Sequence, residues 1–337
     1  MIDLVTGASG RIGRHLVPAL LKNGDEVKVL VKEKMVEPEN VEVFYGDLLD
    51  KESLKKAVES VDVIFHLAAI VDYLAPKDLM FKVNVVGTKN LLEVSKGKKF
   101  IYLSSTAVMG KKFKELPINE ETPSHPSDFY GKTKFEAEKL VKDHGGIIIR
   151  STDVFGPGFT EGYNFVISGL ERGKLPIIGD GKNFIQWVHI NDLVQALLLA
   201  KKRGKPGEVY IIAGKEFKTL KQLWNLLCKY LNVETPKKHV SKISAKILAH
   251  SKMLKGRILK ERPKFIPEYI DKITSNRTFD ISKARTELGF EPQIGYDEAA
   301  MEMIEEYRKE KEYEEMIKKE LEEKQEEISK EQSEQQS

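Results

Sequence analysis

Short apolar runs alternate with amphipathic stretches through the N-terminal part of the chain. The apolar runs lie at 2–5, 27–31, 41–45, 61–67, 100–103 and 147–149, and helical patterns lie near 51–60, 79–96 and 130–144. Alternation of this kind predicts a parallel sheet with helices on both faces. Strands that are apolar almost throughout indicate a sheet covered on both sides. We therefore expect an α/β fold with a Rossmann-type, doubly wound parallel sheet.

After Arg150 the pattern changes, because glycine and proline break the chain into loops. A helix at 192–200 and a strand at 209–213 are expected to return to the sheet. We therefore predict a sheet unit of residues 1–155 plus about 184–215. A smaller C-terminal substrate lobe would comprise about 156–183 plus 216–306, followed by a charged helical or disordered tail at 307–337.

The charge distribution is uneven although the net charge is only +3. Residues 308–337 hold 7 Lys/Arg and 11 Asp/Glu, whereas residues 237–264 hold ten Lys/Arg and one acid. Apolar residues at helical spacing in 237–264 favour a core-facing helix over a substrate cap, and a cap over membrane contact. A net charge this small gives no reason to expect a nucleic-acid partner.

Other bulk features indicate a cytoplasmic protein. No apolar run approaches the length of a membrane span, and no leader pattern precedes the first expected strand. The single cysteine, Cys228, lies in an apolar run and is expected to be a buried thiol. The histidines show no metal-ligand spacing, so no metal is predicted.

Three glycines connect the first expected strand to the first helix. Gly7, Gly10 and Gly13 allow the backbone to turn tightly and to approach a pyrophosphate closely. The N–H groups and the positive dipole end of the following helix would then hold the phosphates. This arrangement predicts a dinucleotide cofactor site on the sheet unit.

The residues after the second expected strand bear on the choice of cofactor. NAD-binding proteins commonly place an acid there, whereas this chain has Val31 followed by Lys32. Lys32, and Arg11 within the glycine turn, could pair with a 2′-phosphate. The cofactor is therefore NAD or NADP, and these two side chains favour NADP. The alternative for Lys32 is that it is only a solvated residue at the strand end.

Tyr130 and Lys134 lie one turn apart on a predicted helix. A nearby ammonium group would lower the pKa of the phenol toward the range of general acid–base catalysis. Ser105, after the fifth expected strand, could bind the substrate oxygen, or it could only satisfy the loop backbone.

The chain resembles the extended short-chain dehydrogenases/reductases, the NAD-dependent epimerase/dehydratase family, over about residues 1–306. The motifs that carry this resemblance are Thr6-Gly7-x-x-Gly10-x-x-Gly13, His66-Leu67-Ala68-Ala69, Asn84-Val85-x-Gly87-Thr88, Ser104-Ser105, Tyr130-x-x-x-Lys134, Gly156-Pro157-Gly158, Trp187-Val188-His189-Ile190-Asn191-Asp192 and Lys283-Ala284-x-x-Glu287-Leu288-Gly289-Phe290.

The resemblance implies a role for each matched residue. Ser105, Tyr130 and Lys134 would be catalytic, with Lys134 also binding the nicotinamide ribose. Substrate contacts would come from Thr106, Asp153 and Lys182. The cofactor-binding residues would be Gly7, Gly10, Arg11, Ile12, Gly13, Lys32, Asp47, Leu48, Leu67, Ala68, Ala69, Tyr130 and Lys134.

Departures from the family pattern narrow the expected chemistry. Thr106 and Ala107 stand where 4,6-dehydratases carry acids, so dehydration is not expected. Gln186 replaces an arginine that binds diphosphates, Asp153 would repel a sugar phosphate, and Met109 makes an apolar wall.

Three functions remain open at this stage. The leading prediction is hydride transfer at a secondary alcohol or ketone carbon in a (nucleotide-)sugar epimerase. The first alternative is an NADPH ketone reductase resembling dihydroflavonol reductases or hydroxysteroid dehydrogenases. The second is a non-catalytic NAD(P)-binding sensor or assembly factor. A small-molecule substrate and a homodimer are the expected partners.

Overall fold

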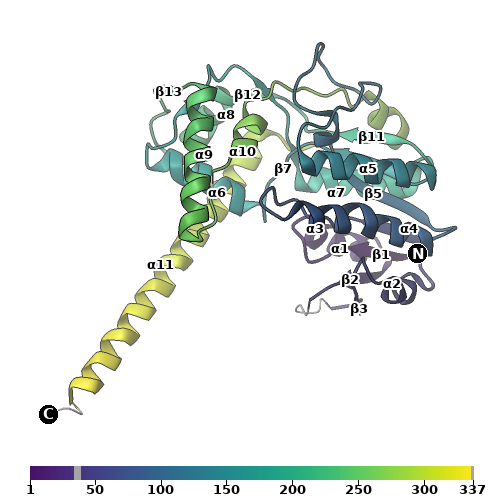
Figure 1. Cartoon of the computed structure of the whole chain (residues 1–337), viewed down its shortest axis with the longest axis horizontal. Coiled ribbons are helices and arrows are strands. Elements are labelled where there is room, and N and C mark those ends of the chain that lie inside the picture. The colour runs from purple at the N-terminus through teal and green to yellow at the C-terminus, as the bar shows by residue number, and fades with distance from the viewer. Residues whose placement is uncertain (34–38, 264, 335–337) are drawn as a thin grey trace.

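The computed structural model describes residues 1–33, 39–263 and 265–334. Its centre is a seven-stranded parallel sheet in the order β3-β2-β1-β4-β5-β6-β11 (Figure 1). The strands are β1 (Ile2–Thr6), β2 (Glu26–Val31), β3 (Val41–Tyr45), β4 (Val63–His66), β5 (Lys99–Ser105), β6 (Ile147–Ser151) and β11 (Val209–Ile212). The predicted doubly wound sheet is confirmed, including the return of the chain to the sheet at β11.

Helices cover both faces of the sheet because successive strand residues point to opposite sides. On β1, Leu4 packs into the core under α2, α4 and α5, whereas Val5 packs into the core under α1 and α7. The helices on the two faces are α1 (Gly13–Lys22), α7 (Ile190–Arg203), α2 (Lys51–Val58), α4 (Thr88–Val94) and α5 (Phe129–Asp143). Three short turns complete this part: α3 (Lys77–Phe81), the π-helical η1 (Lys82–Gly87) and the 3₁₀ η2 (Thr106–Met109).

The chain reverses direction across the sheet between β1 and β4. Connections from β1 run outward to β2 and β3, whereas β4, β5, β6 and β11 extend the other way. Ligands of such sheets bind at the carboxyl ends of the strands beside this switch point. The glycine turn after β1 therefore occupies the expected position for a cofactor.

A smaller lobe packs at the carboxyl edge of the sheet. Its main core lies among α6 (Thr160–Glu171), α8 (Leu220–Leu231) and the start of α11 (Tyr296–Glu334). The remaining elements are α9 (Lys242–Leu259), α10 (Pro267–Ile273), the π-helical η3 (Ala284–Leu288) and three strand pairs, β7 (Val154–Phe155) with β10 (Val188–His189), β9 (Phe184–Ile185) with β12 (Lys218–Thr219) and β8 (Ile177–Ile178) with β13 (His239–Val240).

The basic stretch contains α9. The sequence predicted that the apolar residues of this helix face the core, and this prediction is wrong. Ala245 and Ala249 face inward against Ile178 and Ile270, and the larger apolar residues of α9 point to solvent. The physical reason is that α10 lies close to α9 at these small side chains. The packed face of α9 is therefore its alanine face.

The C-terminal tail continues a helix that begins in the lobe. α11 projects away from the body (Figure 1) and extends to Glu334. Among the described residues, no helix combines the length and apolarity needed to cross a bilayer.

Candidate active site

The glycine turn fits closely against the neighbouring strand end. Gly7 has φ +73°, and a Cβ there would lie 2.7 Å from the backbone nitrogen of Ala68. A Cβ on Gly13 would overlap the carbonyl oxygen of Gly7. No side chain caps the N-terminus of α1 at Ile12. The turn therefore combines close backbone approach with an open helix N-terminus, which fits a dinucleotide pyrophosphate.

Buried hydrogen bonds fix the strand ends beside this turn. His66 Nδ1 lies 2.7 Å from Thr6 Oγ1, and His66 Nε2 lies 2.9 Å from Thr88 Oγ1. Burial, followed by the charge of Lys134, lowers the pKa of His66 to about 3, so its ring is neutral. This bridge joins β1, β4 and α4 under the segment Leu67–Ala69, which was predicted to line the cofactor path.

A second anchor holds the loop after β4. The Asn84 side chain accepts from the N–H of Ile70 at 2.7 Å and donates to its carbonyl at 2.9 Å. It also donates to Thr133 Oγ1 at 3.0 Å. Asn84 therefore ties this loop to α5 beside Tyr130. Sequence analysis noted the Asn84 motif but gave it no role.

At the expected adenine end, Lys32 and Asp47 form an ion pair. Lys32 Nζ lies 2.8 Å from Asp47 Oδ2, and Lys32 is 70% exposed. The hydrogen bond from Lys32, and a backbone hydrogen bond from Leu49, lower the pKa of Asp47. Arg11 does not join this pair, because its guanidinium group lies over the Phe159 ring at 5.5 Å. Leu48, which follows Asp47 in the chain, is buried.

The structure brings Tyr130 and Ser105 together at the end of β5. Asp128 caps α5 by accepting from the N–H of Gly131 at 2.8 Å, which places Tyr130 in the first turn. The Ser105 hydroxyl lies near the Tyr130 phenol and lowers its pKa. Ser105 Oγ also accepts from the N–H of Ala107 at 3.1 Å. Ser105 therefore both contacts Tyr130 and supports the loop backbone.

The pKa of Tyr130 differs from the sequence expectation. Burial raises it, with further increases from the charges of Asp128 and Asp153, while the hydrogen bond with Ser105 lowers it. Lys134 instead donates to the Leu103 carbonyl at 2.6 Å and lies 4.0 Å from the centre of the Tyr102 ring. Tyr130 consequently holds its proton at neutral pH.

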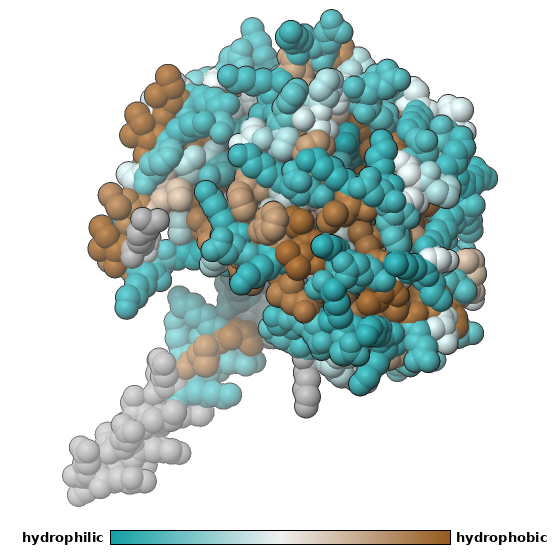
Figure 2. All heavy atoms as spheres, turned by 45° about the vertical axis from the view of Figure 1, so that its right-hand side comes forward, coloured by the Kyte–Doolittle hydropathy of each residue, from teal (hydrophilic) through white to brown (hydrophobic). Residues whose placement is uncertain are grey.

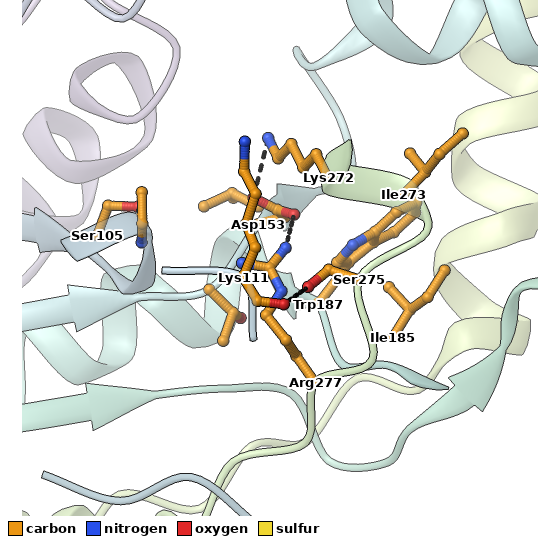
Figure 3. Close-up of polar contacts among 12 residues, drawn as sticks. Ser105, Lys111, Asp153, Ile185, Trp187, Lys272, Ile273, Ser275 and Arg277 are labelled. Carbon is orange, nitrogen blue, oxygen red and sulfur yellow. Dashed lines mark hydrogen bonds and ion pairs between the residues drawn. The ribbon is translucent and has the colours of Figure 1, made fainter. Parts of the chain in front are cut away.

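Asp153, which was predicted to contact the substrate, lies between two cations from the lobe (Figure 3). Lys272 Nζ is 2.9 Å from Asp153 Oδ1, and Arg277 is 3.6 Å from Asp153 Oδ2. Burial opposes ionisation of Asp153, but the two cations hold its pKa below the ordinary value. The partners of Asp153 are thus Lys272 and Arg277, whereas Lys182 is exposed on the loop beside Asp180.

Three other residues that were singled out in the sequence are Thr106, Met109 and Gln186. Thr106 is buried in η2 beside Ser105, and Met109, which was expected to make an apolar wall, packs within the main core. Gln186 accepts from the N–H of Phe279 at 2.7 Å and donates to the Gly214 carbonyl at 2.9 Å. Gln186 therefore holds lobe segments together.

An aromatic side chain of the loop after β4 borders Tyr130 and in turn contacts the lobe. The Tyr73 ring lies 6.2 Å from Tyr130 and 5.9 Å from Tyr269 of α10, both edge to face. Asp72 pairs with Arg262, which follows α9. These contacts join the loop after β4 to the lobe. No motif in the sequence marks Tyr73, Tyr269, Lys272 and Arg277 as site residues, because only folding brings them to the site.

Comparisons with known proteins show the family to which this chain belongs. The model of the NAD dependent epimerase/dehydratase family matches residues 4–213. "Uncharacterized protein y4nG" of Sinorhizobium fredii is 31% identical over 315 residues, covering 90% of this chain and 77% of that protein. The sterol-4-alpha-carboxylate 3-dehydrogenase, decarboxylating, of Mus musculus is 27% identical, covering 90% of each chain. The UDP-glucose 4-epimerase of Thermotoga maritima, solved with UDP-glucose, has a TM-score of 0.74 at 25% identity, covering 92% of this chain and 99% of that one.

Proposed function

Because this chain belongs to the NAD-dependent epimerase/dehydratase family, we propose that it is an NAD(P)-dependent dehydrogenase or ketoreductase of a largely apolar substrate. One observation carries this proposal. The hydroxyl groups of Tyr130 and Ser105 lie near each other at the sheet edge that also bears the glycine turn, with Lys134 one helical turn further on. β4 alone separates β1 from β5, which places these strand ends roughly 10 Å apart.

The sheet unit holds the cofactor in this proposal. Gly7, Gly10 and Gly13, with the N–H groups of Arg11 and Ile12, would bind the pyrophosphate. Asp47 and Leu48 would border the adenine, and Leu67, Ala68 and Ala69 would follow the ribose. Lys134 would reach the nicotinamide ribose. Bound nicotinamide supplies or accepts the hydride.

Tyr130 handles the proton of the substrate oxygen. Tyr130 carries its proton at neutral pH and would donate it as a ketone oxygen gains negative charge. Ser105 would hold the same oxygen through its hydroxyl. Thr106 and Ala107 offer no acid for water elimination, so dehydration is not proposed.

NADPH is the cofactor that we propose. Lys32 lies at the end of β2 with its side chain 70% exposed, where it can meet a 2′-phosphate. Its ion pair with Asp47 keeps the ammonium group at this edge. Arg11, held over Phe159, lies apart from this pair and is not assigned to the phosphate.

The substrate site favours an apolar molecule over a nucleotide sugar. Tyr73 and Tyr269 provide an aromatic wall beside Tyr130. Gln186 is engaged by lobe backbone and is not available to bind a diphosphate. The similarity to a sterol dehydrogenase along 90% of both chains supports the same choice.

Sugar epimerisation is the second candidate. The ion pairs of Asp153 with Lys272 and Arg277 offset the repulsion that an isolated carboxylate would exert on a sugar phosphate. Likeness to a UDP-glucose 4-epimerase along nearly the whole chain also supports it. An epimerase returns the hydride to the same molecule and keeps its cofactor, whereas a reductase exchanges cofactor in every cycle.

The test compares Tyr130→Phe with Tyr313→Phe, a matched change at an exposed tyrosine of α11. We expect Tyr130→Phe to reduce NADPH-dependent reduction of a 3-ketosteroid probe by about 10²- to 10⁴-fold while NADPH binding is retained. Tyr313→Phe should match the wild type. Retained NAD together with conversion of UDP-glucose would instead favour the epimerase. If cells carrying Tyr130→Phe in place of the wild type showed an unchanged phenotype, that result would favour a binding protein without turnover.

A further inference from the structure

The outer face of α9 is apolar although the lobe leaves it uncovered. The large apolar side chains that α9 exposes are Ile243, Ile247, Leu248, Leu254, Ile258 and Leu259, each between 50% and 73% exposed. Single exposed apolar residues are ordinary on proteins, but six on one helix mark an interaction surface. Figure 2 shows brown side chains along the edge above the projecting tail, where Figure 1 places α9.

The spacing of these residues defines the face. At 100° per residue, Ile243, Ile247, Leu254 and Ile258 fall within about 60° of one another around the helix. Ala245 and Ala249 lie on the opposite side, buried against Ile178 and Ile270. α9 therefore has two apolar faces, of which the small-residue face holds it to the lobe. The face with the larger side chains is turned outward.

All charged residues of α9 are basic. The sequence of α9 contains no aspartate or glutamate. Lys252, Lys255 and Lys260 are exposed, and Lys242 and Lys246 pair with Asp271 of α10. Long lysine side chains can extend their charges to phosphate groups while their stems rest on apolar surface. At 100° per residue, Lys246 and Lys255 lie about 90° to either side of the aliphatic face, whereas Lys252 and Lys260 lie further round the helix. Aliphatic side chains with cations on both flanks match the boundary between headgroups and acyl chains of an anionic bilayer.

We propose that α9 docks in the plane of an anionic lipid surface, with Ile243, Ile247, Leu254 and Ile258 inserted among the lipids. This departs from the sequence expectation, which ranked membrane contact last because it placed the apolar residues of α9 in the core. Pairing of α9 with its own copy would bring lysines together. The competing occupant is therefore the acidic α11 of a second molecule.

The position of α9 gives this docking a consequence for the active site. α9 is joined to α10 by the ion pairs to Asp271, and Tyr269 of α10 contacts Tyr73 beside Tyr130. A docked α9 would hold the aromatic wall near the lipid, from which an apolar ketone could enter. This consequence rests on the proposed function, whereas the docking itself does not.

The test measures co-sedimentation of the full chain with vesicles, without cofactor or substrate, so its outcome is independent of the proposed reaction. Vesicles of phosphatidylcholine mixed with phosphatidylglycerol should retain the protein at low salt, and vesicles of phosphatidylcholine alone should not. Ile247→Glu and Ile258→Glu should each weaken binding by about tenfold or more, since a charge replaces an inserted aliphatic group. Met316→Glu, at an exposed apolar residue of α11, is the matched control and should bind as the wild type does.

Three results would overturn the proposal. The wild type could fail to sediment with anionic vesicles at low salt, or both isoleucine variants could bind as strongly as the wild type. Light scattering could instead show a dimer that Ile247→Glu and Met316→Glu both dissociate, without vesicle binding. That result would assign the α9 face to the α11 of a second copy.

Discussion

At the scale of single residues, Lys134 has the least ordinary environment in the site. Its side chain is 2% exposed, and burial lowers its pKa to about 7, partly opposed by the charge of Glu138. Its amine donates to the Leu103 carbonyl and lies over the Tyr102 ring, contacts that a neutral amine can also make. Lys134 therefore titrates near neutrality in the folded protein, but near 10.5 when the chain is unfolded.

This difference makes stability depend on pH in a defined direction. Between about pH 7 and pH 10 the unfolded chain binds more protons at Lys134, so the free energy of unfolding should rise with pH. The contribution approaches about 1.4 kcal/mol per pH unit. In urea unfolding at several pH values, Lys134→Met should remove this slope, whereas Lys319→Met on the exposed part of α11 should keep it. Equal slopes in the wild type and Lys134→Met would show that Lys134 is charged in the folded protein.

At the scale of elements, the turn between β1 and α1 depends on what lies beside each glycine. Gly7 and Gly24 both have positive φ, so alanine at either position carries a backbone cost of roughly 1–2 kcal/mol. A Cβ on Gly7 meets the backbone of Ala68, whereas a Cβ on Gly24 meets nothing within 4 Å. Comparing alanine at Gly7 with alanine at Gly24 therefore separates the effect of backbone strain from the effect of contact with Ala68.

We expect Gly7→Ala to weaken NADPH binding by about tenfold or more, because the turn must move away from β4 to accommodate the Cβ. Gly24→Ala should lower stability by a similar backbone cost but leave the dissociation constant of NADPH unchanged. Isothermal titration calorimetry and thermal unfolding on both variants give the two quantities. If both variants bound NADPH equally well, the close approach of Gly7 to Ala68 would not matter for the cofactor.

Some residues of the candidate site could be predicted from the sequence and others could not. The glycine turn, Ser105 and the Tyr130–Lys134 helix were predictable, because each depends on local spacing along one strand, turn or helix. Lys272, Arg277 and Tyr269 were not, because the lobe brings them from distant sequence to Asp153 and Tyr73. The orientation of α9 was misjudged for a related reason. Periodicity identifies an apolar face but not whether another element covers it.

At the scale of the whole molecule, α11 ties the lobe to the carboxyl edge of the sheet before it projects outward. Glu306 accepts from the N–H of Gly158 at 2.9 Å, and Glu302 lies 2.9 Å from His189 Nε2. Further along, the Tyr307 hydroxyl donates to Glu171 at 2.7 Å, and Lys311 pairs with the same carboxylate. The anchored part of α11 therefore extends to about Lys311.

This boundary predicts a large effect at one tyrosine of α11 and almost none at another, six residues further on. Tyr307→Ala should lower the free energy of unfolding by roughly 3 kcal/mol, because it empties a site that is 7% exposed and removes the hydrogen bond to Glu171. Tyr313→Ala, at a residue that is 61% exposed, should change it by less than about 0.5 kcal/mol. Deletion of residues 318–337 should likewise leave the melting temperature of dilute protein nearly unchanged. Chemical denaturation of the three variants measures these differences in the free energy of unfolding. If the deletion destabilised the chain as much as Tyr307→Ala does, the projecting part of α11 would have to pack against another surface, such as the α9 face of a second molecule.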